Sequence, residues 1–210
     1  MLQRATSPRP RPQRKLPRPI AVAITGGIGA GKSEALYAFQ KAGAATVSSD
    51  EIVHHLLRDD ARVKEAIVRR LGEEVLDEEG NVDRQRVGAI VFGDREKLDF
   101  LEQLLHPIVA AEYLQWREQL GELPNPPKVA VTEVPLLFET GAQERFDKIV
   151  VITAPARLRE QRRRVARDDR DQRLLPDREK VKRADFTYVN KGTLEELDEW
   201  VAGVMAELTR

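Results

Sequence analysis

Cysteine is absent from this 210-residue chain, and aromatic residues make up only 5% of it. Without cysteine the chain forms no disulfide, has no thiolate nucleophile and offers no sulfur ligand to zinc. Net charge is absent too, because 35 basic residues balance 35 acidic ones, which argues against a surface devoted to nucleic acid or an anionic membrane. No apolar run approaches the roughly 18 residues of a membrane span. These absences predict a cytoplasmic protein that binds neither nucleic acid nor membrane.

Residues 1–19 differ in composition from the rest of the chain. They contain six basic residues, five prolines and no acidic residue. Proline at this density prevents a helix or a central strand, and the like charges repel one another. We therefore expect a disordered basic tail, with a weak anchor for an anionic surface as the alternative. The hydrophobic share of the whole chain, 41%, is enough for the core of one domain.

Short apolar segments rich in β-formers alternate with helical patterns from residue 20 onwards. The expected strands are 20–25, 44–48, 129–134, 149–153 and 186–189, and the expected helices include 33–42, 51–71, 83–120, 155–168 and 193–208. This alternation predicts an α/β domain with a parallel sheet. Residues 58–128 lack a convincing strand and are interpreted as a helical insertion between the second and third strands.

The segment Gly26–Ser33, with the sequence GGIGAGKS, directly follows the first expected strand and leads into the first expected helix. It fits the pattern G-x-x-x-x-G-K-[ST], in which glycines let successive backbone N–H groups point at one anion. The helix N-terminus adds the positive end of its dipole. Lys32 is expected to reach the β- and γ-phosphates, and the Ser33 hydroxyl to bind Mg²⁺. The segment therefore predicts binding of a nucleoside triphosphate.

Two carboxylates follow expected strands whose carboxyl ends lie beside this phosphate loop. Asp50 ends the second strand, where it either orients and deprotonates an acceptor hydroxyl or caps the next helix. Glu133 ends the third strand, where it is placed to hold Mg²⁺ through water. Glu139, shortly after, is interpreted as an N-cap or a salt-bridge residue.

The stretch 157–183 contains ten arginines and two lysines against six acidic residues. Arg159, Arg163, Arg167 and Arg170 fall on one helical stripe. Because the stretch follows the fourth strand, it leaves the sheet at the same end as the phosphate loop. We expect a lid that brings positive charge over the triphosphate, with a solvated surface helix as the alternative.

Several segments, in order along the chain, resemble the bacterial dephospho-CoA kinase family. They are TGGIGAGKS at 25–33, Ser49-Asp50, Asp83-Arg84 with Val91-Phe92, Leu105-His106-Pro107, VPLLFE at 134–139, Arg183-Ala184-Asp185 and Asn190-Lys191-Gly192. The resemblance covers about residues 20–208. It implies ATP-dependent phosphorylation of the ribose 3′-hydroxyl of dephospho-CoA, which gives CoA and ADP in the last step of CoA synthesis.

The resemblance also implies an architecture like that of nucleoside-monophosphate kinases. The three-layer α/β/α core, with a five-stranded parallel sheet, would span 20–57 and 129–210. The helical insertion at 58–128 would bind the CoA substrate, and the Arg-rich lid would lie at about 157–183. We expect this protein to act as a monomer.

Site residues follow from the same resemblance. Lys32, Asp50, Arg163 and Arg167 are expected to be catalytic, with Asp50 as the base. ATP is expected to contact Gly26, Gly27, Ile28, Gly29, Ala30, Gly31, Lys32, Ser33, Glu34, Arg170 and Asn190. Dephospho-CoA is expected to contact Asp50, His106, Pro107 and Leu136. Mg²⁺ is expected at Ser33, with Glu133 acting through water.

Some residues depart from the family pattern or leave another interpretation open. The family often has aspartate where Ser48 and Glu133 stand, so Asp50 must serve alone at the end of the second strand. His106, taken by itself before Pro107, suits a packed or capping residue at a helix-ending turn.

Two other functions stay open. One is another small-molecule or nucleotide kinase on the same scaffold. The other is a GTP-binding switch protein, although Thr193 stands where the guanine-reading pattern N-K-x-D needs an aspartate.

Overall fold

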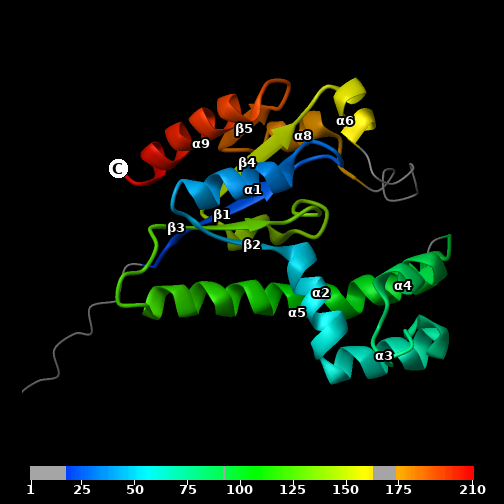
Figure 1. Ribbon diagram of the computed structural model, residues 1–210. Coiled ribbons are helices and arrows are strands. Elements are labelled where there is room, and N and C mark those ends of the chain that lie inside the picture. Colours follow the sequence, from blue (N-terminus) through cyan, green and yellow to red (C-terminus); the bar gives the residue numbers. More distant parts are fainter. Residues whose placement is uncertain (1–17, 92, 163–173) are drawn as a thin grey trace, which may run out of the picture.

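Five parallel strands form the sheet of the computed structural model, which describes residues 18–91, 93–162 and 174–210 (Figure 1). The strands are β1 (Ile20–Thr25), β2 (Ala45–Ser48), β3 (Val129–Glu133), β4 (Lys148–Thr153) and β5 (Phe186–Val189). Their order across the sheet is β2-β3-β1-β4-β5, and each neighbouring pair is parallel. The α/β fold with a five-stranded parallel sheet, expected from the sequence, is confirmed.

The register of the strands brings the carboxyl ends of three of them to one edge of the sheet. β1 and β3 are central and buried on both faces, which is why their sequences are almost continuously apolar. Ile24 in β1 pairs with Glu133 in β3, and Glu133 pairs with Ser48 in β2. The segments that follow β1 and β2 therefore start beside Glu133.

The helices surround the sheet and fill the connection between β2 and β3 (Figure 1). They are α1 (Lys32–Lys41), α2 (Ser49–Asp59), α3 (Ala61–Leu71), α4 (Arg84–Val91), α5 (Arg95–Glu122), α6 (Ala156–Arg162), α8 (Asp177–Val181) and α9 (Leu194–Leu208), with the 3-10 helices η1 (Glu73–Val75) and η2 (Ala142–Arg145).

Two helices expected to be continuous are each broken in two. The helix expected over 51–71 breaks at Asp60, whose carboxylate accepts hydrogen bonds from two backbone N–H groups in the first turn of α3. The helix expected over 83–120 breaks after α4, where Gly93 adopts a φ of 82° and Asp94 caps α5. In both places a capping aspartate starts a new helix in a new direction.

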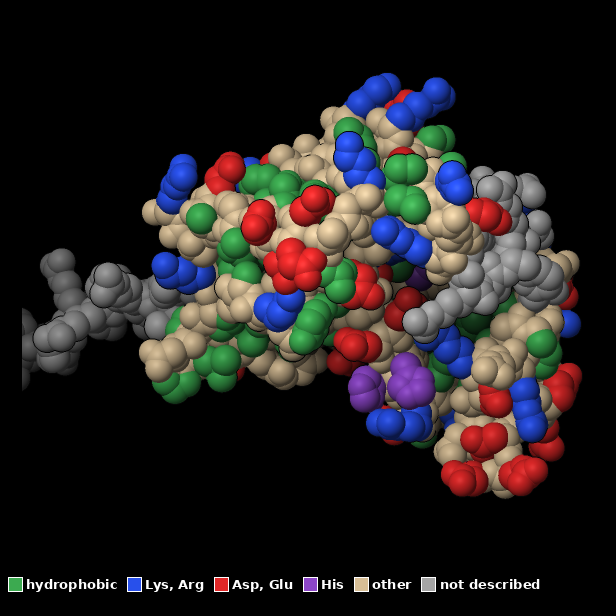
Figure 2. Space-filling model, turned by 45° about the horizontal axis from the view of Figure 1, so that its top comes forward, with side chains coloured by type: hydrophobic (Ala, Val, Ile, Leu, Met, Phe, Trp, Pro, Cys, Tyr) green, Lys and Arg blue, Asp and Glu red, His purple; other side chains and the backbone are tan. Residues whose placement is uncertain are grey.

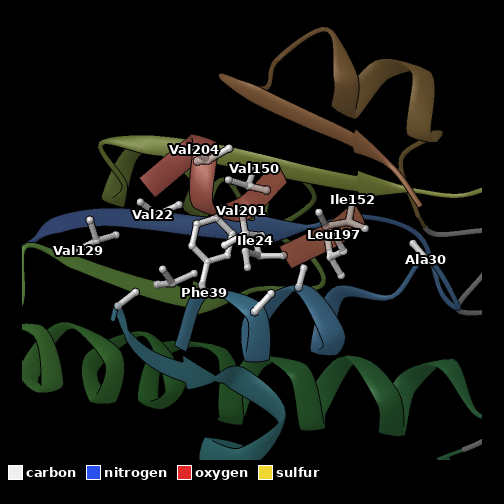
Figure 3. Close-up of a cluster of buried hydrophobic side chains, with 14 residues drawn as sticks. Val22, Ile24, Ala30, Phe39, Val129, Val150, Ile152, Leu197, Val201 and Val204 are labelled. Atoms are coloured by element: carbon white, nitrogen blue, oxygen red, sulfur yellow. The ribbon is translucent and has the colours of Figure 1, made fainter. Parts of the chain in front are cut away.

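Helices α1 and α9 pack together over one face of the sheet (Figure 3). Phe39 of α1 and Leu197 and Val201 of α9 join Val22 and Ile24 of β1 in one buried cluster. Val22 and Ile24 are two positions apart in the strand, so their side chains point to the same face of the sheet. Because α1 starts directly after the phosphate loop, this cluster also anchors that loop.

The insertion between β2 and β3 has a hydrophobic core of its own. Ile67, Val87 and Tyr113 represent the buried residues that α3, α4 and α5 contribute to it. Tyr113 also stacks on Phe146, with 5.6 Å between the ring centroids. Phe146 packs in turn against the cluster around Leu137, which covers the second face of the sheet. The insertion is therefore attached to the sheet through an apolar contact.

Pro107 lies inside α5, so the turn expected at His106-Pro107 is wrong. Leu105 and Val109 are buried on either side of it. These residues pack α5 into the core of the insertion, and that packing carries the helix through the proline despite its missing N–H.

Acidic and basic side chains are interspersed over the face shown in Figure 2.

Arg18, at the start of the described chain, forms an ion pair of 2.8 Å with Asp147. The rest of the expected basic tail, residues 1–17, lies outside the described residues. Among the helices of the described segments, none is long and apolar enough to cross a membrane.

Candidate active site

The phosphate loop, residues 26–31, joins β1 to α1 in a tight curl. Gly29 and Gly31 adopt φ values of 73° and 92°, a region that side chains other than glycine rarely enter. The Ala30 N–H donates to the Gly27 carbonyl at 3.2 Å, which closes a turn, and α1 begins at Lys32. The loop therefore has the strand–loop–helix geometry that suits an anion at a helix N-terminus.

Asn190, directly after β5, holds the loop from one side. Its Nδ2 donates to the Ala30 carbonyl at 2.9 Å in a buried hydrogen bond. A Cβ atom on Gly31 would overlap this same Nδ2. Glycine is thus required at residue 31 both by its backbone conformation and by the closeness of Asn190.

Helices α6 and α8 hold the loop from another side. Arg159 of α6 forms an ion pair of 3.2 Å with Asp177 of α8, and Asp177 also accepts from Thr153 Oγ1, at the end of β4, at 2.8 Å. A Cβ atom on Gly27 would come within 2.6 Å of Arg159 Nη1. The first described turns of the Arg-rich stretch therefore lie against the phosphate loop.

Ser33, in the first turn of α1, faces the end of β3. Its Oγ donates to Glu133 Oε2 at 3.3 Å, and Glu133 is only 5% exposed. A hydroxyl and a carboxylate are oxygen ligands of the kind Mg²⁺ prefers, and Mg²⁺ commonly uses one or two protein ligands together with phosphates. The described residues contain no group of three or more His, Cys, Asp or Glu side chains suited to a metal. The pair therefore fits a cation that arrives with a nucleotide.

Asp50 lies in the first turn of α2, and its expected alternative role as the N-cap is wrong. Ser48 is the N-cap, because its hydroxyl accepts from the Asp50 N–H at 3.2 Å and Glu51 completes a capping box. The Asp50 side chain is 62% exposed, and its Oδ1 accepts from Arg84 Nη2 at 3.1 Å. Ser48, which stands where the family often has aspartate, thus starts α2 and leaves the Asp50 carboxylate at the surface.

The charged groups at this edge of the sheet influence one another. Burial lowers the pKa of Lys32 below its usual value of 10.5, an effect that Glu133 and Asp50 oppose and that Lys180 reinforces. Burial raises the pKa of Glu133 above 4.5, and the Lys32 charge opposes this, whereas Asp50 and Glu51 add to it. Groups from α1, α2, β3 and α8 therefore act on one another's charges at the phosphate loop.

The sequence was compared with known protein families, and the dephospho-CoA kinase family matches residues 20–196. The chain belongs to this family. A dephospho-CoA kinase of Aquifex aeolicus is 35% identical over 195 residues, which cover 90% of this chain and 97% of the relative.

Solved structures share the fold of this chain. A crystal structure of a Thermus thermophilus protein has a TM-score of 0.73 and 32% identity, covering 92% of this chain and all of the other. The dephospho-CoA kinase of Campylobacter jejuni has a TM-score of 0.63 at 24% identity, covering 90% and 96% of the two chains, and it supports the fold. The resemblance expected from the sequence is confirmed, and this member of a kinase family is an enzyme.

The other residues expected at the site of this family member lie on different elements of the fold. His106 and Pro107 are exposed in the middle of α5, and Glu34 is exposed in the first turn of α1. Leu136 is partly buried after β3, and its carbonyl accepts from Thr140 Oγ1 at 2.8 Å. The three expected lid arginines lie outside the described residues: Arg163, Arg167 and Arg170.

Sequence analysis missed Lys180, a completely buried lysine in α8. Its Nζ lies 2.8 Å from Glu139 Oε1, which also accepts from the Leu175 N–H at 2.8 Å. The structure thus decides for the salt-bridge interpretation of Glu139. No signal in the sequence separates Lys180 from the exposed Lys182 nearby, because its burial depends on a partner from another part of the chain.

A cavity of about 530 Å³ lies elsewhere, between α2, α3 and α5. Ile52, Leu56 and Asp59 of α2 line it, with Glu112 of α5. At 100° per residue these α2 positions face away from Asp50. We therefore assign this cavity no part in the site at the phosphate loop.

Proposed function

We propose that this enzyme transfers the γ-phosphoryl group of ATP to the ribose 3′-hydroxyl of dephospho-CoA. The observation that carries the proposal is that, in a member of the dephospho-CoA kinase family, the phosphate loop lies at the same sheet edge as Asp50 and Glu133. The products are CoA and ADP. Family membership favours this acceptor over the other small-molecule kinases and over a GTP-binding switch.

The phosphate loop holds the triphosphate of ATP in this proposal. Backbone N–H groups of the loop that are not used within it, unlike that of Ala30, would bind the phosphates, and the N-terminus of α1 adds its dipole. Lys32 lies at that N-terminus and contributes a cation to the β- and γ-phosphates. Phosphoryl transfer depends mainly on such positioning and charge stabilisation.

Asp50 acts on the acceptor. Its carboxylate orients the 3′-hydroxyl and takes the hydroxyl proton as the oxygen bonds to the γ-phosphorus. The bond between the γ-phosphorus and the bridging oxygen breaks, and that oxygen leaves with ADP. The exposed position of Asp50 at the start of α2 supports this role, because an acceptor can reach it.

Ser33, directly, and Glu133, through water, are the residues that we assign to Mg²⁺ bound with ATP. When bound, the ion neutralises charge on the β- and γ-phosphates. Glu133 is positioned by β3 and by its hydrogen bond from Ser33, so its carboxylate is oriented before the nucleotide arrives.

Arginines of the lid complete the proposed site. Arg163 and Arg167 neutralise charge on the transferring group, and Arg170 contacts ATP, as the resemblance implies. The contact of Arg159 with Asp177 beside the loop supports this proposal, because it fixes α6, which directly precedes these three arginines in the sequence.

The remaining contacts are proposals of the same kind. Glu34 and Asn190 are assigned to ATP. His106, Pro107 and Leu136 are assigned to dephospho-CoA. We also propose that the enzyme works in the cytoplasm and that it is a monomer. Size-exclusion chromatography with light scattering would test the oligomeric state.

A coupled assay of ADP release tests the function. The purified chain is incubated with ATP and Mg²⁺, and dephospho-CoA, AMP, CMP and shikimate are offered in turn. We expect ADP release only with dephospho-CoA, and CoA as the product by mass spectrometry. The Lys32→Gln variant is the control for a contaminating kinase. ADP release no higher than with ATP alone would refute the proposal.

The role of Asp50 is tested by Asp50→Asn, which preserves shape and removes the proton acceptor. We expect kcat to fall by about 100-fold or more, the usual cost of losing a general base, with ATP affinity unchanged. Asp59→Asn on the same helix, where the aspartate side chain is 56% exposed, is the matched control. Near-normal turnover of Asp50→Asn would remove it as the base.

A further inference from the structure

Arg84, the first residue of α4, reaches from the helical insertion to the proposed base. Its Nη2 donates to Asp50 Oδ1 at 3.1 Å, although the two residues are 34 positions apart in the sequence. The segment Asp83-Arg84 was part of the family resemblance, but neither the fold nor the proposed function gives Arg84 a task. The contact therefore points to a role for Arg84 beside Asp50.

The backbone that carries Arg84 is fixed by its surroundings. The Asp83 N–H donates to the Val75 carbonyl at 2.9 Å, and the Asp83 carboxylate accepts from the Gln85 N–H at 2.6 Å. Val87, one turn further on, is 2% exposed in the core of the insertion. The backbone at the start of α4 is thus held in place, and the Arg84 side chain extends from it to Asp50.

Asp50 lies in an acidic neighbourhood. Among the groups whose charges interact there are the carboxylates of Glu133 and Glu51, and the cation of Lys32. The Lys32 cation does not act on these carboxylates alone, because its Nζ donates a hydrogen bond to the Gly27 carbonyl at 3.3 Å. Arg84 is the cation in direct contact with Asp50 within the described residues.

The geometry of the contact leaves one oxygen of Asp50 available. Arg84 takes Oδ1, and in the described parts of the chain no hydrogen-bond donor is found at Oδ2. A guanidinium group is planar and always charged, so it fixes the carboxylate orientation better than a freely rotating ammonium does. One oxygen is thereby oriented and the other can accept a proton.

We propose that Arg84 is a positioning residue, which orients Asp50 so that Oδ2 faces the acceptor hydroxyl. Because Arg84 belongs to the insertion, it ties the orientation of the base to the part of the molecule that is proposed to bind dephospho-CoA. The inference rests on the proposed function and deepens it. The inference concerns the orientation of the Asp50 carboxylate, and it assigns Arg84 no contact with the phosphates of ATP.

The pair is exposed, which makes it suitable for mutation. The side chains of Arg84 and Asp50 are 55% and 62% exposed, and ion pairs of this kind contribute little to folding. Arg70→Gln is the matched control, because Arg70 forms an ion pair of 3.0 Å on the same insertion with a different carboxylate, that of Glu96. We expect the melting temperatures of Arg84→Gln and Arg70→Gln to change equally little.

The kinetic test compares Arg84→Gln and Arg84→Lys with the unmodified chain. We expect kcat of Arg84→Gln to fall on the order of tenfold or more, by analogy with residues that orient the ligands of a catalytic metal ion, with the Kd of ATP unchanged. Arg84→Lys restores part of the loss, because it keeps the charge. Added guanidinium ions should also raise the kcat of Arg84→Gln and leave that of Arg70→Gln unchanged.

A double-mutant cycle gives the deciding result. If Arg84 acts through Asp50, then Arg84→Gln has no further effect on kcat in the Asp50→Asn background. An equal loss in both backgrounds would overturn the inference, as would a normal kcat of Arg84→Gln or a change confined to the KM of dephospho-CoA. If the unmodified chain fails to phosphorylate dephospho-CoA, the proposed function fails and the inference falls with it. An active chain that Arg84→Gln does not slow refutes the inference alone.

Discussion

Lys180 Nζ lies 2.8 Å from Glu139 Oε1, and the lysine side chain is completely buried. The pair joins α8 to the segment that follows β3, and Glu139 also receives the Leu175 N–H. Asp177, one turn before Lys180, pairs with Arg159 at the phosphate loop. The buried pair therefore fixes the helix that carries Asp177, and Asp177 holds Arg159 beside the phosphate loop.

Replacing Lys180 by methionine should destabilise the fold. The change leaves the largely buried Glu139 without its cation, and breaking one side of a buried pair typically costs about 3–5 kcal/mol. The double variant Lys180→Met/Glu139→Gln should recover much of that loss, because no uncompensated charge remains. Urea unfolding measures both free energies.

Lys182→Met is the matched control for this experiment. Lys182 pairs with Glu179 at 3.1 Å but its side chain is 68% exposed, so the expected cost is about 0–1 kcal/mol. Equal costs for Lys180→Met and Lys182→Met would mean that burial does not determine the importance of the Glu139 pair.

Gly31→Ala should destabilise the protein more than Gly43→Ala, although both glycines have nearly the same φ angle. Their φ values are 92° and 91°, so a Cβ atom adds about 1–2 kcal/mol of strain at either position. At Gly43 nothing lies within 4 Å of the added atom, whereas at Gly31 it overlaps Asn190 Nδ2. The difference between the two unfolding free energies measures the tightness of the Asn190 contact.

A second substitution separates the contact from the strain. Asn190→Ala removes the overlapping atom, so Gly31→Ala should cost less in the Asn190→Ala background than in the unmodified chain. If the cost of Gly31→Ala is the same in both backgrounds, Asn190 does not restrict the loop.

Local patterns in the sequence were enough to predict the sheet and the phosphate loop. Buried parallel strands need continuous apolar runs, and the loop at 26–33 needs its glycines and lysine at fixed spacing. The breaks at Asp60 and Gly93 were missed, because the apolar periodicity continues across them. Their local signals, an aspartate before an apolar pattern and a Gly-Asp pair, are ordinary capping signals that the periodicity outweighed.

Contacts between distant parts of the chain were not predictable in the same way. Arg84 and Asp50 are 34 residues apart, and Lys180 and Glu139 belong to different segments around the sheet. Each pair depends on how two elements pack, and charged residues are common throughout this chain, which is 33% charged. The sequence therefore indicated the chemistry of the loop but not the side chains that orient its neighbours.

Ser33→Ala should raise the Mg²⁺ concentration needed for half-maximal activity, because it removes the hydroxyl that hydrogen-bonds to Glu133 and is proposed to bind the ion. We expect a rise of about 10- to 100-fold, the range typical of losing a group at a metal site. Ser33→Thr keeps the hydroxyl and is the matched control. A Mg²⁺ titration of ADP release measures all three chains, and an unchanged midpoint in Ser33→Ala would contradict the assignment.

Nucleotide affinity should depend on pH through Lys32. Burial lowers the pKa of Lys32 below 10.5 in the free protein, and bound phosphates raise it again because they favour the ammonium form. Binding therefore takes up a proton between the two pKa values, so the affinity falls as the pH rises from the pKa of the free protein to that of the complex. Calorimetry with a non-hydrolysable ATP analogue, without Mg²⁺ and in two buffers of different ionisation enthalpy, measures this uptake directly. Lys32→Gln should remove both the uptake and the alkaline loss of affinity, whereas Lys64→Gln on α3 should keep them; an alkaline loss that persists in Lys32→Gln would assign the titration to another group.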